Sequence, residues 1–353
     1  MNEPAKLDLA ATADRIEAVS RIVITTHARA DGDAVGCIAA LQRILRQRGK
    51  TAAAYLHEPV LDRYAFLTEW EPLLVWDDRT AEEVLAGAEL LLIVDTCAVD
   101  QLRAMADLIK VATIQRIAID HHVTRENVVD AVLADEKAGA SAQIVTNLCD
   151  HAEWRIDAEA AGLLYTGLAT DTGWFRFSNA DSAVFTTAAR LIDAGARPNE
   201  LFERLYLSDC EARARLVGAA LSSFELHADG RLAVIRLTRE MVERCGATHD
   251  MTEDLINEPQ RVGSVVACVL FIQPPTDGLI RVSLRSKRGV DVAALAARFG
   301  GGGHERAAGV RISGTMESVA RQIIPAMIEA VESMPVSVHG KNTSADDADF
   351  ADG

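Results

Sequence analysis

The stretch RIVITTHARADGDAVGCIAALQRILRQRG, residues 21–49, places an apolar strand, a loop of acidic and histidine side chains and an amphipathic helix in direct succession. The β-branched run Arg21–Thr26 is typical of a buried strand. Apolar side chains then recur at helical spacing through Asp33–Gln47, and Gly49 stands just past the end of this segment. A strand followed at once by a helix is the repeating unit of an α/β protein with a parallel sheet.

The same alternation continues along the first half of the chain. Strands are expected at Thr51–Leu56, Glu89–Asp95 and Arg116–Asp120, and the pattern turns helical from about Ser141 to Glu211. Because these strands are apolar along their whole length, we expect helices on both faces of the sheet. The sequence therefore predicts an N-terminal α/β domain built on a parallel sheet.

The second half changes character. Strands are expected at Arg231–Leu237, Gly263–Ile272 and Gly278–Arg285, and helices at Val290–Phe299 and Met316–Ser333. These elements predict a smaller α/β domain with a sheet of its own. We place the N-terminal domain at residues 1–195, a helical linker at 196–221, the C-terminal domain at 222–334 and a disordered acidic tail at 335–353.

Charge and composition limit what the protein can do. The 353 residues include 36 basic and 52 acidic side chains, a net charge of −16. An excess of acid argues against a protein that coats long nucleic acid, but not against a small anionic substrate. No apolar run reaches the ~20 residues of a membrane span, no export signal is recognisable, and the 6 cysteines are scattered. We therefore expect a cytoplasmic protein without a membrane partner.

Side chains able to bind metal ions follow three of the expected strands. His27, Asp31 and Asp33 come after the strand Arg21–Thr26, and Asp95 comes after Leu90–Val94. Asp120 is the last residue of the strand Arg116–Asp120, and His121 and His122 come directly after it. Asp171 ends a helical stretch in the sequence TDTG, residues 170–173. Ligands of open parallel sheets bind beyond the carboxyl ends of the strands, so we expect these side chains to converge.

Such a set of carboxylates requires cations, because neighbouring carboxylates do not ionise together cheaply. Two divalent cations about 3.5–4 Å apart would balance the charge, activate a water and hold a phosphoryl group. A ligand set of Asp and His without Cys suits Mn²⁺, Mg²⁺ or Co²⁺ rather than a structural zinc. Any one of these acids alone is more often a turn or cap residue, and Asp33 is a candidate N-cap. Their joint occurrence at the ends of successive elements favours the metal site.

A second candidate site is the run GGGGHERAAG, residues 300–309. Taken alone, four glycines indicate a flexible loop. The run directly follows a predicted helix and precedes a predicted strand, and glycine N–H groups can form a nest for an anion. Nearby, the end of a predicted strand carries Arg285, Ser286, Lys287 and Arg288. These residues indicate either a solvated basic turn or a second phosphate-binding patch.

Five motifs of this chain occur in a characteristic order: HARADGDAVG (residues 27–36), DT (95–96), DHH (120–122), TDTG and GGGGHERAAG. Together they resemble the DHH phosphoesterase family, in its branch with the DHH-associated C-terminal domain. The resemblance covers residues 21–333 and implies two Mn²⁺ ions in a cleft between the domains. His27 and Asp31 would bind one ion and Asp33 the other, Asp95 would bridge both, and His121 and Asp171 would complete the second site. His122 would face the substrate phosphate, and Asp120 would orient the histidines.

The resemblance also implies how the nucleotide is held. The corresponding residues of the C-terminal domain are Arg285, Ser286, Gly302, Gly303, His304 and Arg306. The order of the motifs and the size of the chain resemble most the members of this branch that hydrolyse short oligoribonucleotides to mononucleotides and 3′-phosphoadenosine-5′-phosphate (pAp) to AMP, so we expect this activity. The resemblance also allows a homodimer. The main alternative is a phosphodiesterase of cyclic dinucleotides or their linear products. A pyrophosphatase, a non-catalytic nucleotide-binding regulator and an exonuclease of long nucleic acid are further alternatives that these motifs and the acidic balance disfavour.

Overall fold

The computed structural model describes residues 3–333 except 77–80, 103–104, 107–108, 110–112, 123–125, 276–277 and 288. The chain divides between Ser208 and Asp209 into two compact units. This division lies inside the linker predicted at 196–221. The predicted bounds 1–195 and 222–334, and the expected cleft between the domains, stay predictions. The predicted tail, 335–353, lies outside the described residues.

The first unit is built on a seven-stranded sheet in which all pairs of neighbouring strands are parallel. The strands that carry the candidate metal ligands, β2, β5 and β6, are adjacent in the centre of this sheet, so their carboxyl ends meet at one edge. In spatial order the strands are β1 (Ala5–Leu7), β7 (Ala131–Ala134), β6 (Gln115–Asp120), β5 (Leu90–Val94), β2 (Arg21–Thr25), β3 (Thr51–Leu56) and β4 (Leu74–Val75).

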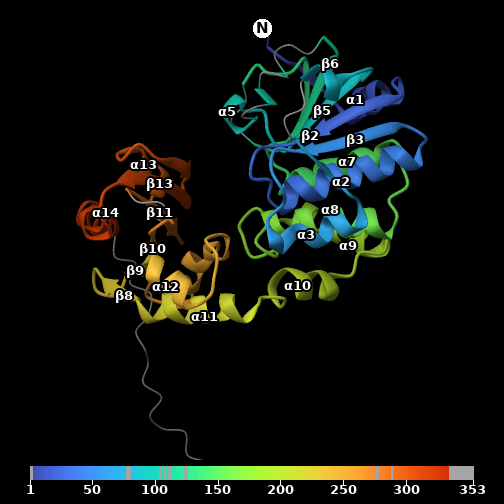
Figure 1. Ribbon diagram of the computed structural model, residues 1–353. Helices are drawn as coiled ribbons and strands as arrows, with labels where there is room; N and C mark the ends of the chain where they lie inside the picture. The colour runs from blue at the N-terminus through green and yellow to red at the C-terminus, as the bar shows by residue number, and fades with distance from the viewer. Residues whose placement is uncertain are drawn as a thin grey trace, which may run out of the picture. The chain divides into compact units, whose positions relative to one another are not determined.

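Helices cover both faces of this sheet, as predicted (Figure 1). Alternate side chains of β5 enter two different cores: Leu90, Leu92 and Val94 face the larger one, and Leu91 and Ile93 face the smaller. The larger core is formed with α1 (Leu9–Glu17), α2 (Gly32–Gln47), α3 (Ala65–Trp70), α7 (Ser141–His151), α8 (Ala158–Asp171), α9 (Ser182–Asp193) and α10 (Pro198–Tyr206). The smaller core includes side chains of α4 (Ala81–Leu85) and α5 (Val99–Leu102).

Helices α2 and α8 pack with their backbones in close contact. A Cβ atom added at Gly36 of α2 would lie 2.4 Å from the carbonyl oxygen of Leu163 in α8, so only glycine fits there. Asp157 caps α8 by accepting a hydrogen bond from the N–H of Ala160 and also binds the guanidinium of Arg43 on α2. This packing fixes the position of Asp33 on α2 relative to Asp171 on α8.

The second unit has a six-stranded sheet in which only β9 and β10 form a parallel pair. In spatial order its strands are β12 (Gly302–His304), β13 (Ala307–Ser313), β11 (Leu279–Ser286), β10 (Ala267–Ile272), β9 (Leu232–Leu237) and β8 (Glu225–His227). One face packs on α13 (Val292–Ala297) and α14 (Met316–Glu332). The other packs, over β9 and β10, on α11 (Glu211–Ser222), α12 (Arg239–Arg244) and the 3₁₀ segments η2 (Asp250–Thr252) and η3 (Leu255–Arg261).

The structure adds elements that the sequence pattern did not predict. Strands β1 and β7 extend the first sheet at one edge. Part of the glycine run, considered above as a loop, forms strand β12, which pairs with β13. Within the described part of the chain, none of the helices has both the length and the apolar composition that crossing a membrane requires.

Candidate metal centre

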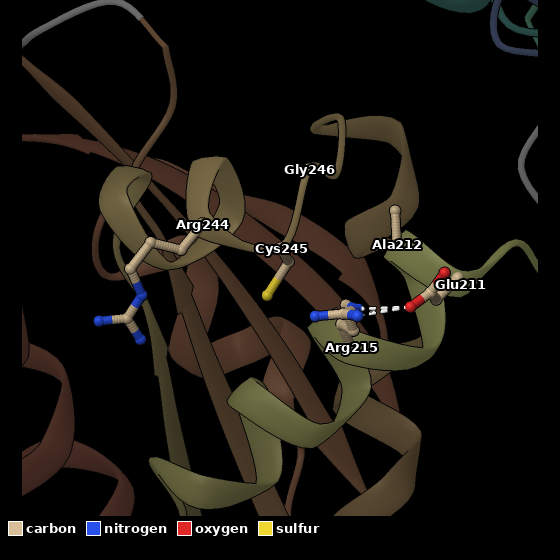
Figure 2. Close-up of a pocket in the computed structure, with 6 residues that line it drawn as sticks. All are labelled: Glu211, Ala212, Arg215, Arg244, Cys245 and Gly246. Carbon is tan, nitrogen blue, oxygen red and sulfur yellow. Dashed lines mark hydrogen bonds and ion pairs between the residues drawn. The ribbon is translucent and has the colours of Figure 1, made fainter.

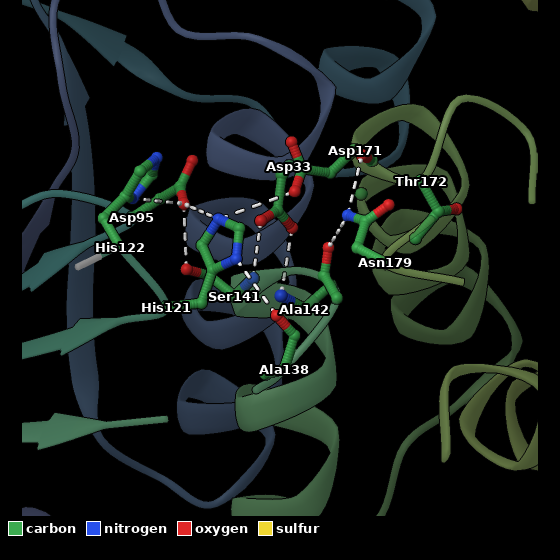
Figure 3. Close-up of polar contacts among 12 residues, drawn as sticks. Asp33, Asp95, His121, His122, Ala138, Ser141, Ala142, Asp171, Thr172 and Asn179 are labelled. Carbon is green, nitrogen blue, oxygen red and sulfur yellow. Dashed lines mark hydrogen bonds and ion pairs between the residues drawn. The ribbon is translucent and has the colours of Figure 1, made fainter. Parts of the chain in front are cut away.

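The candidate ligands meet at the carboxyl edge of the first sheet. Figure 3 shows Asp33, Asp95, His121 and Asp171 among them. His27 follows β2, Asp95 follows β5 in a left-handed conformation (φ 65°), and His121 follows β6. Two groups of three residues each bring one ligand atom per residue within 4.8 Å of the others: His27, Asp31 and Asp95, and Asp33, His121 and Asp171. Together these two groups contain all six residues predicted to bind metal.

A third group links the two sets. Asp95, His121 and His122 also place ligand atoms within 4.8 Å of one another. One carboxylate oxygen of Asp95 lies 3.4 Å from His27 Nε2, and the other lies 3.5 Å from His121 Nε2. Asp95 therefore stands between the two sets of side chains, the place of a bridging carboxylate.

The orientation of two histidines suits metal binding. His27 Nδ1 lies 2.9 Å from the carbonyl oxygen of Ala28, and His121 Nδ1 lies 3.2 Å from that of Ala138. Carbonyl oxygens accept hydrogen bonds, so Nδ1 carries the proton in each ring. In the neutral rings the lone pair is then on Nε2, the nitrogen that faces the carboxylates.

His122 is held differently. Its Nδ1 and its backbone N–H both donate to the same carboxylate oxygen of Asp120, at 2.8 and 3.1 Å. This hydrogen bond raises the pKa of His122 and favours the charged ring. The other oxygen of Asp120 is buried without a hydrogen-bond partner among the described residues. Asp120 thus holds His122 through two hydrogen bonds, and its predicted role of orienting both histidines stays a prediction.

Asp33 is fully enclosed at the centre of the site. It is 1 % exposed, and its carboxylate accepts hydrogen bonds from the backbone N–H groups of Ser141 (2.6 Å) and Ala142 (3.0 Å). These N–H groups open helix α7, whose positive end stabilises an anion. The sequence pattern predicts a helix from Ser141 but not this contact, because the contact joins residues 108 and 109 positions apart in the chain.

Ser141 also reaches the central carboxylate. Its hydroxyl donates to Asp95 Oδ1 at 2.9 Å, and both residues are buried (Figure 3). Nearby, the Asn179 side chain donates to the backbone oxygens of Gly139 and Asp171, and so ties the end of α8 to the loop before α7. Neither residue was predicted from the sequence, since its position depends on contacts between distant segments.

The electrostatics of the cluster require positive charge. Burial and the neighbouring carboxylates, Asp95 among them, raise the pKa of Asp33 and of Asp171 well above the usual value. Although burial opposes protonation of His27, its hydrogen bond with Asp95 raises its pKa to about 9. A proton is thus held where the carboxylates are most crowded. Oxygen and imidazole donors without thiolate fit divalent cations such as Mn²⁺ or Mg²⁺.

The residues predicted to bind the nucleotide lie in the second unit. Arg285 is half-buried on β11, donates to the carbonyl oxygen of Leu284 and has no ion pair among the described residues. Ser286 is buried, and its hydroxyl donates to the carbonyl oxygen of Val290. Its side chain therefore points away from the face that Arg285 occupies, and only its backbone is available there.

The glycine run forms the edge of the same sheet. Gly302 and Gly303 are exposed on β12, and a Cβ atom at Gly303 (φ 145°) would lie 2.4 Å from the carbonyl oxygen of Ala307. His304 pairs with Ala307 in the backbone register, and Arg306 is exposed in the turn that follows. The strand register places Arg285, Ala307 and His304 in one row across three strands.

The second unit also has a pocket of 350 Å³ that contains none of the predicted residues (Figure 2). Arg215, on its wall, donates to Glu211 one helical turn earlier. Arg215 and Arg244 are about two-thirds exposed, at 65% and 68%. The charge of Arg215 is thus already paired, and the pocket adds no candidate to those described above.

Comparison with known proteins identifies the family. The DHH family N-terminal domain matches residues 21–168, and the DHHA1 domain matches residues 240–333. A protein of Thermus thermophilus named bifunctional oligoribonuclease and PAP phosphatase NrnA is 34% identical over 296 residues, covering 83% of this chain and 84% of the relative. The chain belongs to the DHH family.

Two further relatives extend the similarity. The Bacillus subtilis protein of the same name is 28% identical over 298 residues and is matched over 89% of its length, with 82% of this chain covered. A crystal structure of an exopolyphosphatase-related protein from Bacteroides fragilis is 25% identical, with a TM-score of 0.85. The structural match covers 92% of this chain and 95% of the Bacteroides protein's chain. The family and fold expected from the motifs are thereby confirmed.

Proposed function

We propose that the protein is a phosphoesterase that hydrolyses short oligoribonucleotides to mononucleotides and pAp to AMP, and that Mn²⁺ is its metal. The observation that carries the proposal is the pair of ligand triads joined by Asp95. The names of the Thermus and Bacillus relatives support the substrate class. Mg²⁺ and Co²⁺ are the alternatives that the same donor set accepts.

Each residue has a definite part in this function. His27, Asp31 and Asp95 would hold one cation, and Asp33, His121 and Asp171 a second, with Asp95 shared. When bound, the two cations supply Lewis-acid activation of water and neutralise phosphoryl oxygens. His122, held by Asp120, would place its ring beside the phosphate and would stabilise the charge that develops there.

The second unit would bind the rest of the substrate. Arg285 offers a guanidinium without an ion pair in the described chain, which suits bidentate contact with a phosphate. The exposed backbone of Gly302 and Gly303 admits close approach of a ligand. Since the Ser286 hydroxyl is bonded to Val290, we assign Ser286 a backbone contact or a role in shaping the turn. His304 and Arg306 complete this set.

The test is a substrate panel assayed with Mn²⁺. The purified protein should release mononucleotides from RNA of two to five nucleotides and AMP from pAp, and should leave cyclic di-AMP largely intact. Asp95→Asn should lower both activities at least about 100-fold, because it removes the charge of a carboxylate that belongs to one triad and faces His121 of the other. Asp193→Asn, which changes an exposed carboxylate of α9, is the matched control. Full activity of Asp95→Asn would exclude the shared-carboxylate centre.

A cytoplasmic location and a homodimer stay predictions. Gel filtration coupled to light scattering measures the oligomeric state directly. The choice between short and long RNA is measured with the same panel extended to longer strands.

A further inference from the structure

One part of the second sheet is left partly open by the helices, although η3 also borders β11. The face that packs on α11, α12 and η3 over β9 and β10 continues onto β11 and β13, where its side chains are half-buried or exposed, and onto the backbone of β12. On β11, Arg281, Ser283 and Arg285 point to this face and alternate with buried residues of the opposite core. A charged, partly exposed sheet face of this kind is available to a ligand.

The strand register arranges the open face in three rows. Directly opposite residues of antiparallel strands share a face, so each row can be followed across the sheet. The first row is Arg285, Ala307 and His304; the second is Ser283, Gly309 and Gly302; the third is Arg281 and Arg311. Basic residues thus occupy the two outer rows, and the middle row is built from small residues.

The third row contains an unusual pair. Arg281 and Arg311 lie directly opposite each other, and like charges in this position destabilise a sheet. Glu253 forms an ion pair with Arg281 at 2.8 Å. Arg311 is exposed, and its guanidinium forms no hydrogen bond or ion pair with any other described residue. One carboxylate against two guanidinium groups leaves the row with an excess of positive charge, on a chain whose net charge is −16.

The spacing of the rows determines what can occupy them. Arg281 and Arg285 are four residues apart on one strand, which corresponds to about 13 Å. A single phosphate cannot reach both rows, whereas a chain with several phosphates can. The small middle row leaves room for such a chain to lie along the strand, and a positive groove that follows a backbone is typical of single-strand binding.

We propose that Arg281 and Arg311 form a second phosphate subsite. It binds one backbone phosphate of an oligonucleotide while another phosphate of the same strand contacts Arg285. The proposal rests on the proposed function and adds two residues to it. Glu253 is the counter-ion of Arg281, and an incoming phosphate takes over part of that role. The subsite makes the protein favour short oligonucleotides over pAp in binding, because pAp has no phosphate for the third row.

The test measures binding separately from hydrolysis. The full-length protein with Mn²⁺ is titrated with a fluorescent, hydrolysis-resistant phosphorothioate pentanucleotide at several salt concentrations. Arg311→Ala should weaken binding about 5- to 10-fold and reduce the slope of log affinity against log salt by about 0.7, the loss of one phosphate contact. Arg321→Ala, an exposed arginine on α14, is the matched control. Equal affinities of Arg311→Ala and the parent would overturn the proposal.

Two further variants make the result independent of misfolding. Arg311→Glu replaces a like-charge pair with an opposite-charge pair, so it should bind the pentanucleotide still more weakly while melting at the same or a higher temperature. Glu253→Gln should bind it more tightly than the parent does. Unchanged binding by either variant would count against the subsite. Failure of the parent to hydrolyse pAp would refute the proposed function alone, since the binding assay does not depend on it.

Discussion

Removing the Ser141 hydroxyl tests whether the centre is held in place before the metal arrives. Ser141→Ala deletes the hydrogen bond to Asp95 Oδ1 and keeps the backbone N–H that binds Asp33. The substitution therefore affects only the orientation of the shared carboxylate. We expect it to lower the affinity for Mn²⁺.

The magnitude follows from the contact. The bond is 2.9 Å long, and both partners are buried, so water does not replace the lost hydroxyl. A hydrogen bond to a charged group contributes about 1.5–3 kcal/mol, which corresponds to roughly 10- to 100-fold in affinity. Because Asp95 belongs to two of the three groups of ligands, we expect the binding of both cations to weaken.

Isothermal titration of the metal-free protein with Mn²⁺ gives the affinity without reference to activity. Thr146→Val is the control, because it removes a buried hydroxyl from the same helix that bonds only to the carbonyl oxygen of Ala142. The control should bind Mn²⁺ as the parent does. If Ser141→Ala bound Mn²⁺ as tightly as the parent, the hydroxyl would not position Asp95 and the reasoning would be wrong.

Two predictions concern the helix pair that carries Asp33 and Asp171. Gly36→Ala forces a Cβ atom to within 2.4 Å of the Leu163 carbonyl oxygen, so it should lower the free energy of unfolding by about 1–3 kcal/mol in urea titrations. Gly218→Ala is the control: a Cβ atom there meets nothing within 4 Å, so this variant should raise the free energy of unfolding by up to about 1 kcal/mol. Asp157→Ala removes the cap of α8 and the ion pair with Arg43, and should cost about 2 kcal/mol at neutral pH. Burial raises the pKa of Asp157, but the hydrogen bond from Arg43 and its other partners lower that pKa overall. The stability difference between Asp157→Ala and the parent should therefore shrink as the pH falls below about 4. A stability difference that persists in acid would show that the charge of Asp157 does not stabilise the fold.

The convergence of the candidate metal-binding side chains was predictable because it depends on local signals. Each apolar strand and its polar end stand together in the sequence, and a parallel arrangement brings those ends to one edge. The six ligands therefore followed from the strand pattern and from the motifs of the family. Strand β7 was not predicted, because a four-residue segment such as Ala131–Ala134 has little propensity of its own and forms by pairing with β6 and β1.

Contacts between distant segments account for what the sequence did not predict. The hydroxyl of Ser141 meets Asp95, 46 residues earlier in the chain, and no periodic pattern records such a contact. The alternation along β11 separates Arg285 from Ser286, which a motif groups together but the sheet places on opposite faces. The pairing of Gly302–His304 with β13 turns part of an apparent loop into a strand, since glycine alone gives no sign of its partner.

The contact between α7 and Asp33 ties two helices to one side chain. The backbone N–H groups of Ser141 and Ala142 offset only part of the cost of enclosing this carboxylate, because burial and the neighbouring carboxylates still raise the pKa of Asp33 well above its usual value. A substitution that shifts the start of α7 therefore also shifts a candidate ligand carried by α2, even though the substituted residue is far from it in the sequence.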